Sequence, residues 1–229
     1  HTGFPSFAYE DFTANMRPFI SEWEKLDLRF DGILTGFLGS PEQISIVQDF
    51  LRRFHAPDTI VVVDPVMGDS GALYPTYTEE LALGMRALVR EADIITPNLT
   101  EACHLTDTPW HDGKWSMREL TRLAEQMTAM GPQKIVISGI PQGEFISNFL
   151  YMPGRTPCIA RSHRIGTSRS GTGDLFASII AADAVNGVDF TESVKKATRF
   201  IKRCILRSIE MKLPVTDGVA FEELLTGLK

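Results

Sequence analysis

Short β-branched runs alternate with longer amphipathic stretches along most of this sequence, and the alternation limits the folds open to the chain. Each run holds four to six apolar residues between Gly, Pro, Asp or Asn, which predicts a strand buried on both faces. Strands and helices in regular succession predict an α/β fold with a mostly parallel sheet. We predict strands over 31–36, 59–65, 92–98 and 134–139, and helices over 8–26, 41–55, 77–91 and 116–130.

The pattern changes in the last third of the chain. Two strand-like runs over 144–152 and 157–163 are joined by the turn sequence PGRT, which predicts an antiparallel hairpin at the sheet edge. Helical patterns follow over 173–186, 190–210 and 217–228. Since no internal repeat or linker interrupts the chain, we expect residues 1–229 to form a single domain.

Length and composition are those of an ordinary globular protein. The 229 residues are 43% hydrophobic and 23% charged, which suffices for one domain with a buried core. The net charge of −6 is not gathered into a basic stripe, which argues against a nucleic-acid partner. No apolar run approaches the roughly 20 residues of a membrane span, so we expect a soluble protein.

The three cysteines, Cys103, Cys158 and Cys204, show no CxxC spacing. We therefore expect neither a disulfide framework nor a zinc site, and a reducing, cytoplasmic setting.

Polar residues end several of the predicted strands. Asp64 ends one strand, Thr96 and Asn98 end the next, and Ser138 with Gly139 ends a third. In open α/β sheets, ligands bind outside the carboxyl ends of the strands. We therefore expect a ligand site at this rim.

The stretch SRSGTGDLFAS, residues 168–178, superficially resembles a phosphate-binding P-loop. Gly166 and Gly171 have the P-loop separation, but Thr172 and Gly173 stand where that motif needs its lysine and hydroxyl. A dinucleotide fingerprint also fails, because no early strand leads into GxGxxG. Both of these phosphate-binding motifs are thus rejected.

The interpretation left for this stretch is a glycine turn that leads into the start of a helix. The backbone N–H groups of Gly171, Thr172, Gly173 and Asp174 can converge there on an anion. Asp174 then stands beside a transferring phosphoryl group, where it can accept the proton of an attacking hydroxyl. The alternative is that Asp174 only caps the helix.

Two further acidic residues follow the predicted strands. Asp69 lies five residues after Asp64, and Glu101 lies on the helix that begins after Asn98. Carboxylates gathered on one rim repel one another unless they neutralise a cation, and Mg²⁺ uses one or two carboxylates with waters and phosphates. The alternative is that Asp69 is a turn residue and Glu101 a capping partner.

Six motifs in a fixed order resemble the ribokinase superfamily and, within it, the pyridoxal (pyridoxine, pyridoxamine) kinases. They are HTGF (1–4), ILTGF (33–37), DPVMGDSGALY (64–74), ADIITPNLTEA (92–102), VISG (136–139) and SGTGDLFAS (170–178). The resemblance implies a ribokinase-like three-layer αβα sandwich with an edge hairpin. It also implies ATP-dependent phosphorylation of the 5′-hydroxymethyl group of a B6 vitamer, and a homodimer.

The resemblance also implies roles for individual residues. Asp174 matches the catalytic base, with Gly171, Thr172 and Gly173 as the anion hole. Asp64, Asp69, Thr96 and Glu101 match positions that order Mg²⁺, a monovalent cation (K⁺) and the ATP phosphates, with Asn98 alongside. Ser138 matches a contact to the nucleotide phosphates. Thr2 and His1 match contacts to the pyridine ring, and Phe37 stands where these kinases often place a tyrosine against that ring.

The sequence departs from the family in two places. The family opens with a βαβ-like unit that carries a substrate-contacting serine, and such a unit takes roughly 30 residues. No counterpart precedes His1, so we expect the natural protein to be longer. The loop RSHRIGTSRSG carries Arg161, Arg164 and Arg169, which we expect to be solvated surface residues in preference to phosphate contacts.

Two other functions compete with the B6 kinase interpretation. Hydroxymethylpyrimidine (phosphate) kinases share the DPVM and TPN motifs, but their glycine turn is often followed by cysteine. Asp174 and Thr2 therefore favour the B6 vitamers. The second alternative is a protein that binds pyridoxal phosphate or a nucleotide without turnover.

Overall fold

A six-stranded sheet forms the centre of the computed structural model, which describes residues 6, 8 and 10–228. Its strands lie in the order β1 (Gly32–Thr35), β2 (Ile60–Val63), β5 (Ile94–Ile95), β6 (Lys134–Gln142), β7 (Phe145–Tyr151) and β8 (Cys158–His163). The first four strands are parallel, whereas β7 and β8 are antiparallel to their neighbours. The mostly parallel sheet and the edge hairpin are thus confirmed.

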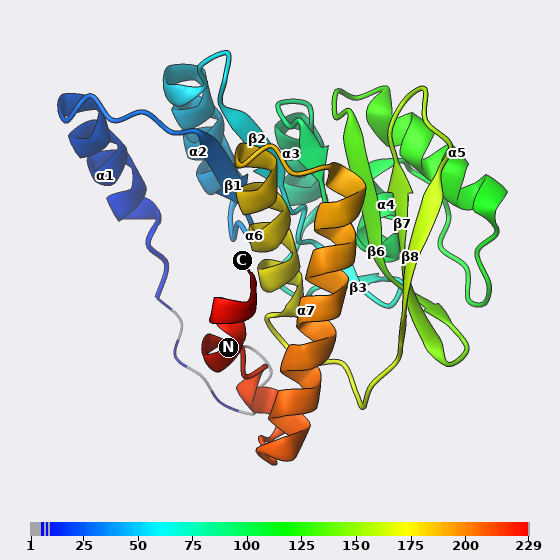
Figure 1. The fold of residues 1–229 in the computed structure, drawn as a ribbon. Coiled ribbons are helices and arrows are strands. Elements are labelled where there is room, and N and C mark those ends of the chain that lie inside the picture. The colour runs from blue at the N-terminus through cyan, green and yellow to red at the C-terminus, as the bar shows by residue number, and fades with distance from the viewer. Residues whose placement is uncertain (1–5, 7, 9, 229) are drawn as a thin grey trace.

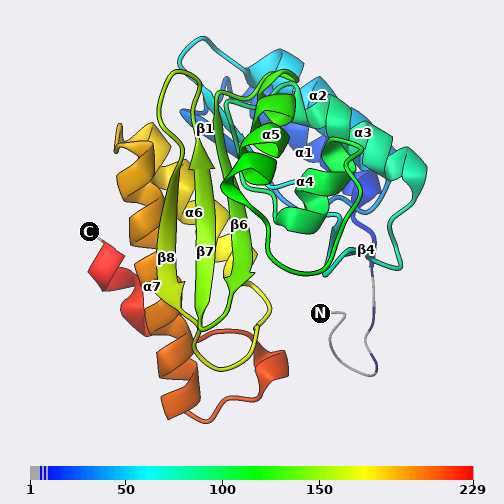
Figure 2. The ribbon, with the colours of Figure 1, turned by 90° about the vertical axis from the view of Figure 1, so that its right-hand side faces the viewer.

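Helices cover both faces of this sheet, as Figures 1 and 2 show. One layer holds α2 (Pro41–Phe54), α3 (Glu79–Val89), α4 (Leu99–Leu105) and α5 (Met117–Thr128), with α1 (Thr13–Lys25) against α2. The other layer holds α6 (Thr172–Val185) and α7 (Phe190–Glu210). Val61 and Val63 belong to the first core and Val62 to the second, because successive side chains of a strand point to opposite faces. The predicted three-layer sandwich is confirmed.

The edge strand β1 differs from its prediction. Ile33 and Thr35 are buried, but Leu34 on the opposite face is 38% exposed. In the described part of the chain β1 pairs only with β2. The prediction of a strand buried on both faces is therefore wrong for β1, although it holds for β2.

Two helix predictions also need correction. The first helix begins at Thr13 instead of residue 8. The last pattern, over 217–228, forms two 3-10 segments, η1 (Val215–Asp217) and η2 (Glu222–Leu228), in place of an α-helix. Gly218 lies between them with φ of 78°, a positive φ that glycine adopts at little cost. No helix in the described ranges is long and apolar enough to cross a membrane.

A small hairpin that the sequence did not predict carries Asp69. Its strands are β3 (Gly68–Asp69) and β4 (Ala72–Leu73), joined by Ser70 and Gly71. Both joining residues have positive φ, 52° and 83°, as the common two-residue hairpin turn requires. The hairpin projects Asp69 from the rim where β2 ends.

Candidate active site

The ends of the parallel strands meet at one rim, as the sequence predicts. Asp64 directly follows β2, and its backbone N–H donates to the carbonyl of Thr35 at the end of β1, at 2.9 Å. Thr96 follows β5, and its hydroxyl donates to Asp64 Oδ1 at 2.8 Å. These bonds hold the ends of three neighbouring strands together and bury the Asp64 carboxylate among them.

Asn98 and Glu101 form a reciprocal cap at the start of α4. Asn98 Oδ1 accepts from the Glu101 N–H at 3.0 Å, and Glu101 Oε2 accepts from the Asn98 N–H at 2.7 Å. Glu101 Oε1 also accepts from the Met67 N–H at 3.1 Å, and Asn98 Nδ2 donates to the Gly68 carbonyl at 2.8 Å. The capping role is therefore present, and the same two side chains fix the base of the β3–β4 hairpin.

The glycine turn lies where α6 meets the rim. Gly171 is the N-cap, with φ of 81°, and no side chain caps the helix, so the first backbone N–H groups are left for another acceptor. A Cβ on Gly173 would lie 3.9 Å from Asp64 Oδ2. The first turn of α6 thus adjoins the buried carboxylate. Asp174 in that turn is exposed, and its carboxylate makes no hydrogen bond within the described residues.

The carboxylates of the rim act on one another. Burial raises the pKa of Asp64 to about 6, the Thr96 hydrogen bond opposes this, and the charge of Asp174 adds to it. Burial also raises the pKa of Glu101 to about 8, reinforced by the charge of Asp64 and opposed by backbone N–H groups. Unpaired carboxylates held this close favour either a bound proton or a cation.

Tyr74 lies within the field of all these acids. Burial raises the pKa of its phenol, and the charges of Glu101, Asp69, Asp64 and Asp174 raise it further, in that order. Tyr74 is therefore close enough to this rim for the charges of all four carboxylates to act on its phenol. Tyr74 was not predicted as a site residue, although it ends the motif that carries Asp64 and Asp69.

A cavity of about 380 Å³ extends from this rim between the hairpin, β6 and the helices α6 and α7. Four predicted site residues line it, namely Asp69, Ser138, Thr172 and Gly173. Asn148, Thr198 and Lys202 line the opposite wall. The cavity wall thus combines these polar groups with apolar side chains from β7, α6 and α7, beside the first N–H groups of α6.

Ser138 and Gly139 lie in a bulge of β6, not at the end of the strand as predicted. The pairing with β7 shifts between Ile137 and Ile140, and β6 continues to Gln142. Gly139 has φ of 68°, and its N–H donates to Asn148 Oδ1 at 3.0 Å. Asn148 Nδ2 in turn donates to the Thr198 hydroxyl at 2.8 Å. Asn148 was not predicted as a site residue, because both of its partners come from other elements.

Arg169 is buried, with 8% of its surface exposed. Its guanidinium donates to the carbonyls of Leu213, Pro214 and Gly218, at 2.9 Å each. The expectation of a solvated side chain is wrong for Arg169, because the chain after α7 folds back over it. Arg161 and Arg164 are exposed, as expected.

The sequence predicts that Phe37, His1 and Thr2 contact the substrate ring. Phe37 follows β1 and is 46% exposed. It does not line the cavity beside α6. His1 and Thr2 lie outside the described residues. The roles assigned to these three residues stay predictions.

The metal assignment also stays a prediction. Within the described ranges, no group of three or more His, Cys, Asp or Glu side chains could hold a metal ion by itself. Mg²⁺ needs fewer protein ligands where phosphates supply the rest. Asp69 on the cavity wall and Asp64 Oδ2 beside α6 fit such a donor set. Both oxygens of Glu101 already accept backbone N–H groups.

Comparisons with known proteins show the family to which the chain belongs. A family model described as phosphomethylpyrimidine kinase matches residues 22–217. The thiamine biosynthetic bifunctional enzyme TH1 of Arabidopsis thaliana is 33% identical over 82% of this chain and 36% of its own length. A pyridoxine/pyridoxal/pyridoxamine kinase of Bordetella avium is 30% identical over 81% of this chain and 64% of its own length. The chain thus spans between about a third and two thirds of these curated relatives.

A solved structure gives the same result for the fold. It is a Bacteroides thetaiotaomicron protein assigned as a phosphomethylpyrimidine kinase, crystallised in a form with pyridoxal. It is 35% identical, has a TM-score of 0.93, and is matched over 100% of this chain and 81% of its own. The predicted fold and the resemblance to pyridoxal kinases are both confirmed. The chain belongs to the phosphomethylpyrimidine kinase family.

Proposed function

We propose that this protein transfers the terminal phosphoryl group of ATP to the 5′-hydroxymethyl group of pyridoxal, pyridoxine or pyridoxamine, forming the 5′-phosphate and ADP. The start of α6 is the observation that supports this most directly. Its first N–H groups have no side-chain cap, and they lie between the Asp64 carboxylate and the 380 Å³ cavity. A helix start of this kind binds anions.

Each group at the rim has a part in this reaction. The N–H groups of Thr172 and Gly173 hold the transferring phosphoryl group, whose charge grows on its outer oxygens. Asp174 accepts the proton of the attacking hydroxyl, and the oxygen of that hydroxyl then acts as the nucleophile. Its exposed position in the first turn leaves its oxygens open to a substrate. The cavity lined by Ser138, Gly139 and α7 accommodates the nucleotide.

A divalent cation completes the site. We propose that Asp69 and Asp64 hold Mg²⁺, which neutralises the charge of the phosphates. Glu101 stands behind them, because its hydrogen bonds to Met67 and Asn98 fix the hairpin that carries Asp69. We further propose that a monovalent cation such as K⁺ binds near the same rim, as in the kinases that the sequence resembles.

Phosphorylation of a hydroxymethylpyrimidine is the second candidate. The family model that matches the chain bears that name, and the site has the same polar rim for either substrate. The acid directly after the glycine turn favours a B6 vitamer, as does the relative crystallised with pyridoxal.

A turnover assay of the full-length protein on both alcohols separates these candidates. We expect ADP formation that depends on Mg²⁺ and pyridoxal, lost by at least a thousandfold in Asp174→Asn. Asp58→Asn, an exposed aspartate away from the rim, serves as the matched control and keeps the wild-type rate. Faster turnover of the pyrimidine would replace the proposed substrate, and a full rate in Asp174→Asn would remove the catalytic role of that residue.

We also propose a cellular location, an oligomeric state and a class of partners for the enzyme. The resemblance to pyridoxal kinases supports a cytoplasmic homodimer whose only partners are small molecules. Light scattering of the full-length protein measures its mass directly, and a monomeric mass at assay concentration would contradict the dimer.

A further inference from the structure

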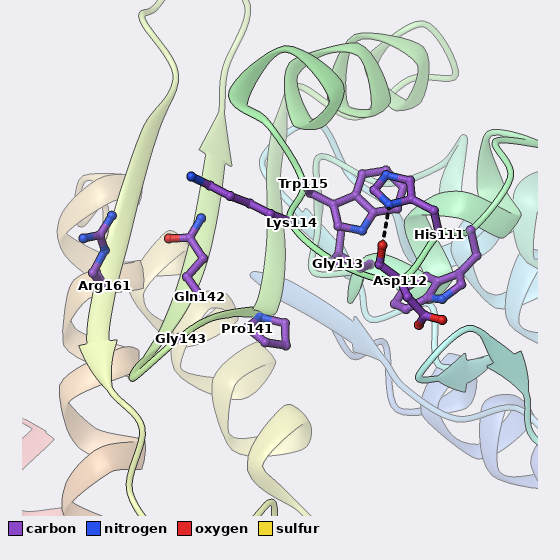
Figure 3. Close-up of a pocket in the computed structure, with 11 residues that line it drawn as sticks. His111, Asp112, Gly113, Lys114, Trp115, Pro141, Gln142, Gly143 and Arg161 are labelled. Carbon is purple, nitrogen blue, oxygen red and sulfur yellow. Dashed lines mark hydrogen bonds between the residues drawn. The ribbon is translucent and has the colours of Figure 1, made fainter.

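A second and larger cavity, of about 670 Å³, lies on the other side of the β6–β7 hairpin (Figure 3). The loop between α4 and α5 forms one wall, and the hairpin with Arg161 of β8 forms the other. Pro141 is the one residue that lines both this cavity and the one beside α6. The volume falls within the range of small-molecule sites, roughly 300–1,000 Å³.

The loop wall is aromatic and firmly packed. Trp115 is 4% exposed, and the His111 ring stacks on it at 4.0 Å between centroids and 16° between planes. Trp110 lies beside this pair, 6.1 Å from Trp115. His111 Nε2 is 3.3 Å from Glu119 Oε1. Trp110 and His111 are only half-buried, so their rings offer the surface on which a planar ligand can pack, with Trp115 behind them.

The facing walls carry positive charge. Lys114 points from the loop toward Gln142 and Arg161 on the hairpin (Figure 3). Within the described residues, neither Lys114 nor Arg161 forms a salt bridge with a carboxylate, and Asp112 is the one acid that lines the cavity. Arg161 is held 5.2 Å over the ring of Phe145. Two cations and an amide therefore face one space.

Backbone conformation opens the same space to a ligand. Gly113 and Gly143 stand on opposite walls with φ of 104° and 62°. A Cβ at either position would meet no atom within 4 Å. The main chain is thus accessible on both sides of the cavity.

We propose that this cavity binds a planar aromatic ring that carries a phosphate, with the ring against the Trp110–His111–Trp115 wall and the phosphate between Lys114 and Arg161. The choice of a phosphorylated ring, the product class, rests on the proposed function. The walls and charges of the cavity do not depend on it.

The cavity also touches the catalytic rim. The Trp110 indole lies against Gly71, where a Cβ would be 2.6 Å from its Nε1. Gly71 belongs to the hairpin that carries Asp69, and its N–H donates to the Thr100 hydroxyl at 2.9 Å. A ligand that displaces Trp110 therefore moves the support of Asp69, which places the site where product can slow the enzyme.

Tryptophan fluorescence gives a direct test of binding. The sequence has three tryptophans. Two of them line the cavity, and the third, in α1, is removed by Trp23→Phe. The probe is pyridoxine 5′-phosphate, whose lack of an aldehyde prevents imine formation with Lys114. A non-hydrolysable ATP analogue and pyridoxine are kept at saturation to fill the proposed active site. We expect saturable quenching and a Kd raised at least tenfold by Lys114→Ala with Arg161→Ala.

A control variant and a control ligand distinguish binding in this cavity from other causes of fluorescence quenching. Lys25→Ala removes an exposed lysine of α1 and leaves the Kd unchanged, and circular dichroism confirms that each variant is folded. Inorganic phosphate binds at least tenfold more weakly than the probe if the aromatic wall contributes. Equal affinities would overturn the ring part of the proposal. No quenching, or quenching that the double variant retains, would overturn the site.

The turnover assay distinguishes this inference from the proposed function. The double variant keeps the basal rate, and product inhibition of the wild type is weaker in it. Binding of the probe without any phosphorylation of B6 vitamers would refute the function and leave the site standing. Turnover without binding in this cavity would refute the site alone.

Discussion

Arg169 is an unusual residue in this structure, because a buried guanidinium is bound by carbonyl groups instead of a carboxylate. Its three acceptors belong to the chain after α7, at Leu213, Pro214 and Gly218. The residue itself stands two positions before Gly171, the N-cap of α6. Arg169 therefore joins the glycine turn to the last segment of the chain.

The substitution Arg169→Met tests this connection between the glycine turn and the last segment of the chain. The substitution leaves three carbonyls without their donor, and each buried group left unsatisfied costs about 1–3 kcal/mol. Because water reaches part of this segment, we expect a loss of about 3 kcal/mol in the free energy of unfolding, measured in urea. Arg118→Met, at an exposed position of α5, is the control and leaves the midpoint unchanged. Equal midpoints for both variants would contradict a structural role for Arg169.

The buried carboxylates make stability depend on pH. Asp64 and Glu101 have folded pKa values of about 6 and about 8, above the ordinary values of 3.8 and 4.5. The folded state therefore binds more protons than the unfolded state between these limits, so stability is lost as pH rises through about 6 and then about 8. With a chelator present, we expect the thermal midpoint to fall from pH 5 to pH 8.5.

Glu101→Gln is the matched variant for that experiment. Its amide oxygen still accepts a backbone N–H, but it does not titrate. We expect a shallower fall of the thermal midpoint above pH 7 in this variant. A midpoint that rises with pH in the wild type, or identical slopes in both proteins, would show that Glu101 is not protonated in the folded state.

At the scale of elements, the β3–β4 hairpin depends on contacts from two directions. Glu101 and Asn98 bond its base, and Trp110 lies against Gly71 at its turn. Gly71 combines φ of 83° with no room for a side chain. The position of Asp69 is therefore set jointly by α4 and by the loop that follows it.

Gly71→Ala perturbs this position. A left-handed conformation costs a non-glycine residue roughly 1–2 kcal/mol, and the added Cβ also displaces the Trp110 indole. We expect kcat/KM for ATP to fall about tenfold. Gly187→Ala, after α6, has a similar φ of 72° with open space around its Cβ, so it reproduces the backbone strain alone. An equal loss of activity in both variants would exclude the hairpin as the cause.

The elements that the sequence predicted well are those with a strong period or a parallel neighbour. The buried runs around Val62 and Ile94 could be assigned because both faces are covered, and their parallel arrangement brought Asp64 and Thr96 together. The β3–β4 hairpin was missed because strands of two residues have no period. The 3-10 segments near the end were predicted as a helix because a short apolar repeat fits both.

The missed site residues share one physical cause. Asn148 and Arg169 are defined by partners that lie at least 44 residues away or on another element. Tyr74 is defined by charges from three separate segments. Contacts of this kind follow from the tertiary fold and leave no local pattern in the sequence.

At the scale of the whole molecule, α6 connects the proposed active site to the core. Phe176 and Ile180 of α6 are buried in the core between the sheet and α7, and Val62 of β2 belongs to the same core. The helix that presents the glycine turn is thus also the centre of one layer. Loss of packing in this layer is expected to affect the entire domain.

Ile180→Ala tests that dependence. Ile180 is fully buried, and such a truncation costs roughly 2–5 kcal/mol. We expect a lower midpoint in calorimetry with a single transition, since residues 1–229 are predicted to be one domain. Leu206→Ala on α7, 39% exposed in the wild type, should change the midpoint little. Two separate transitions would contradict the single domain.

The uncapped start of α6 has one more consequence, for how such a protein changes over evolutionary time. Its donors belong to the main chain, so every residue type except proline preserves them. Under the proposed function, mutations around the pocket can exchange one alcohol substrate for another while these main-chain contacts to the phosphate are kept. Proteins descended from such an ancestor can therefore come to act on new alcohol substrates without losing the backbone N–H groups at the start of this helix.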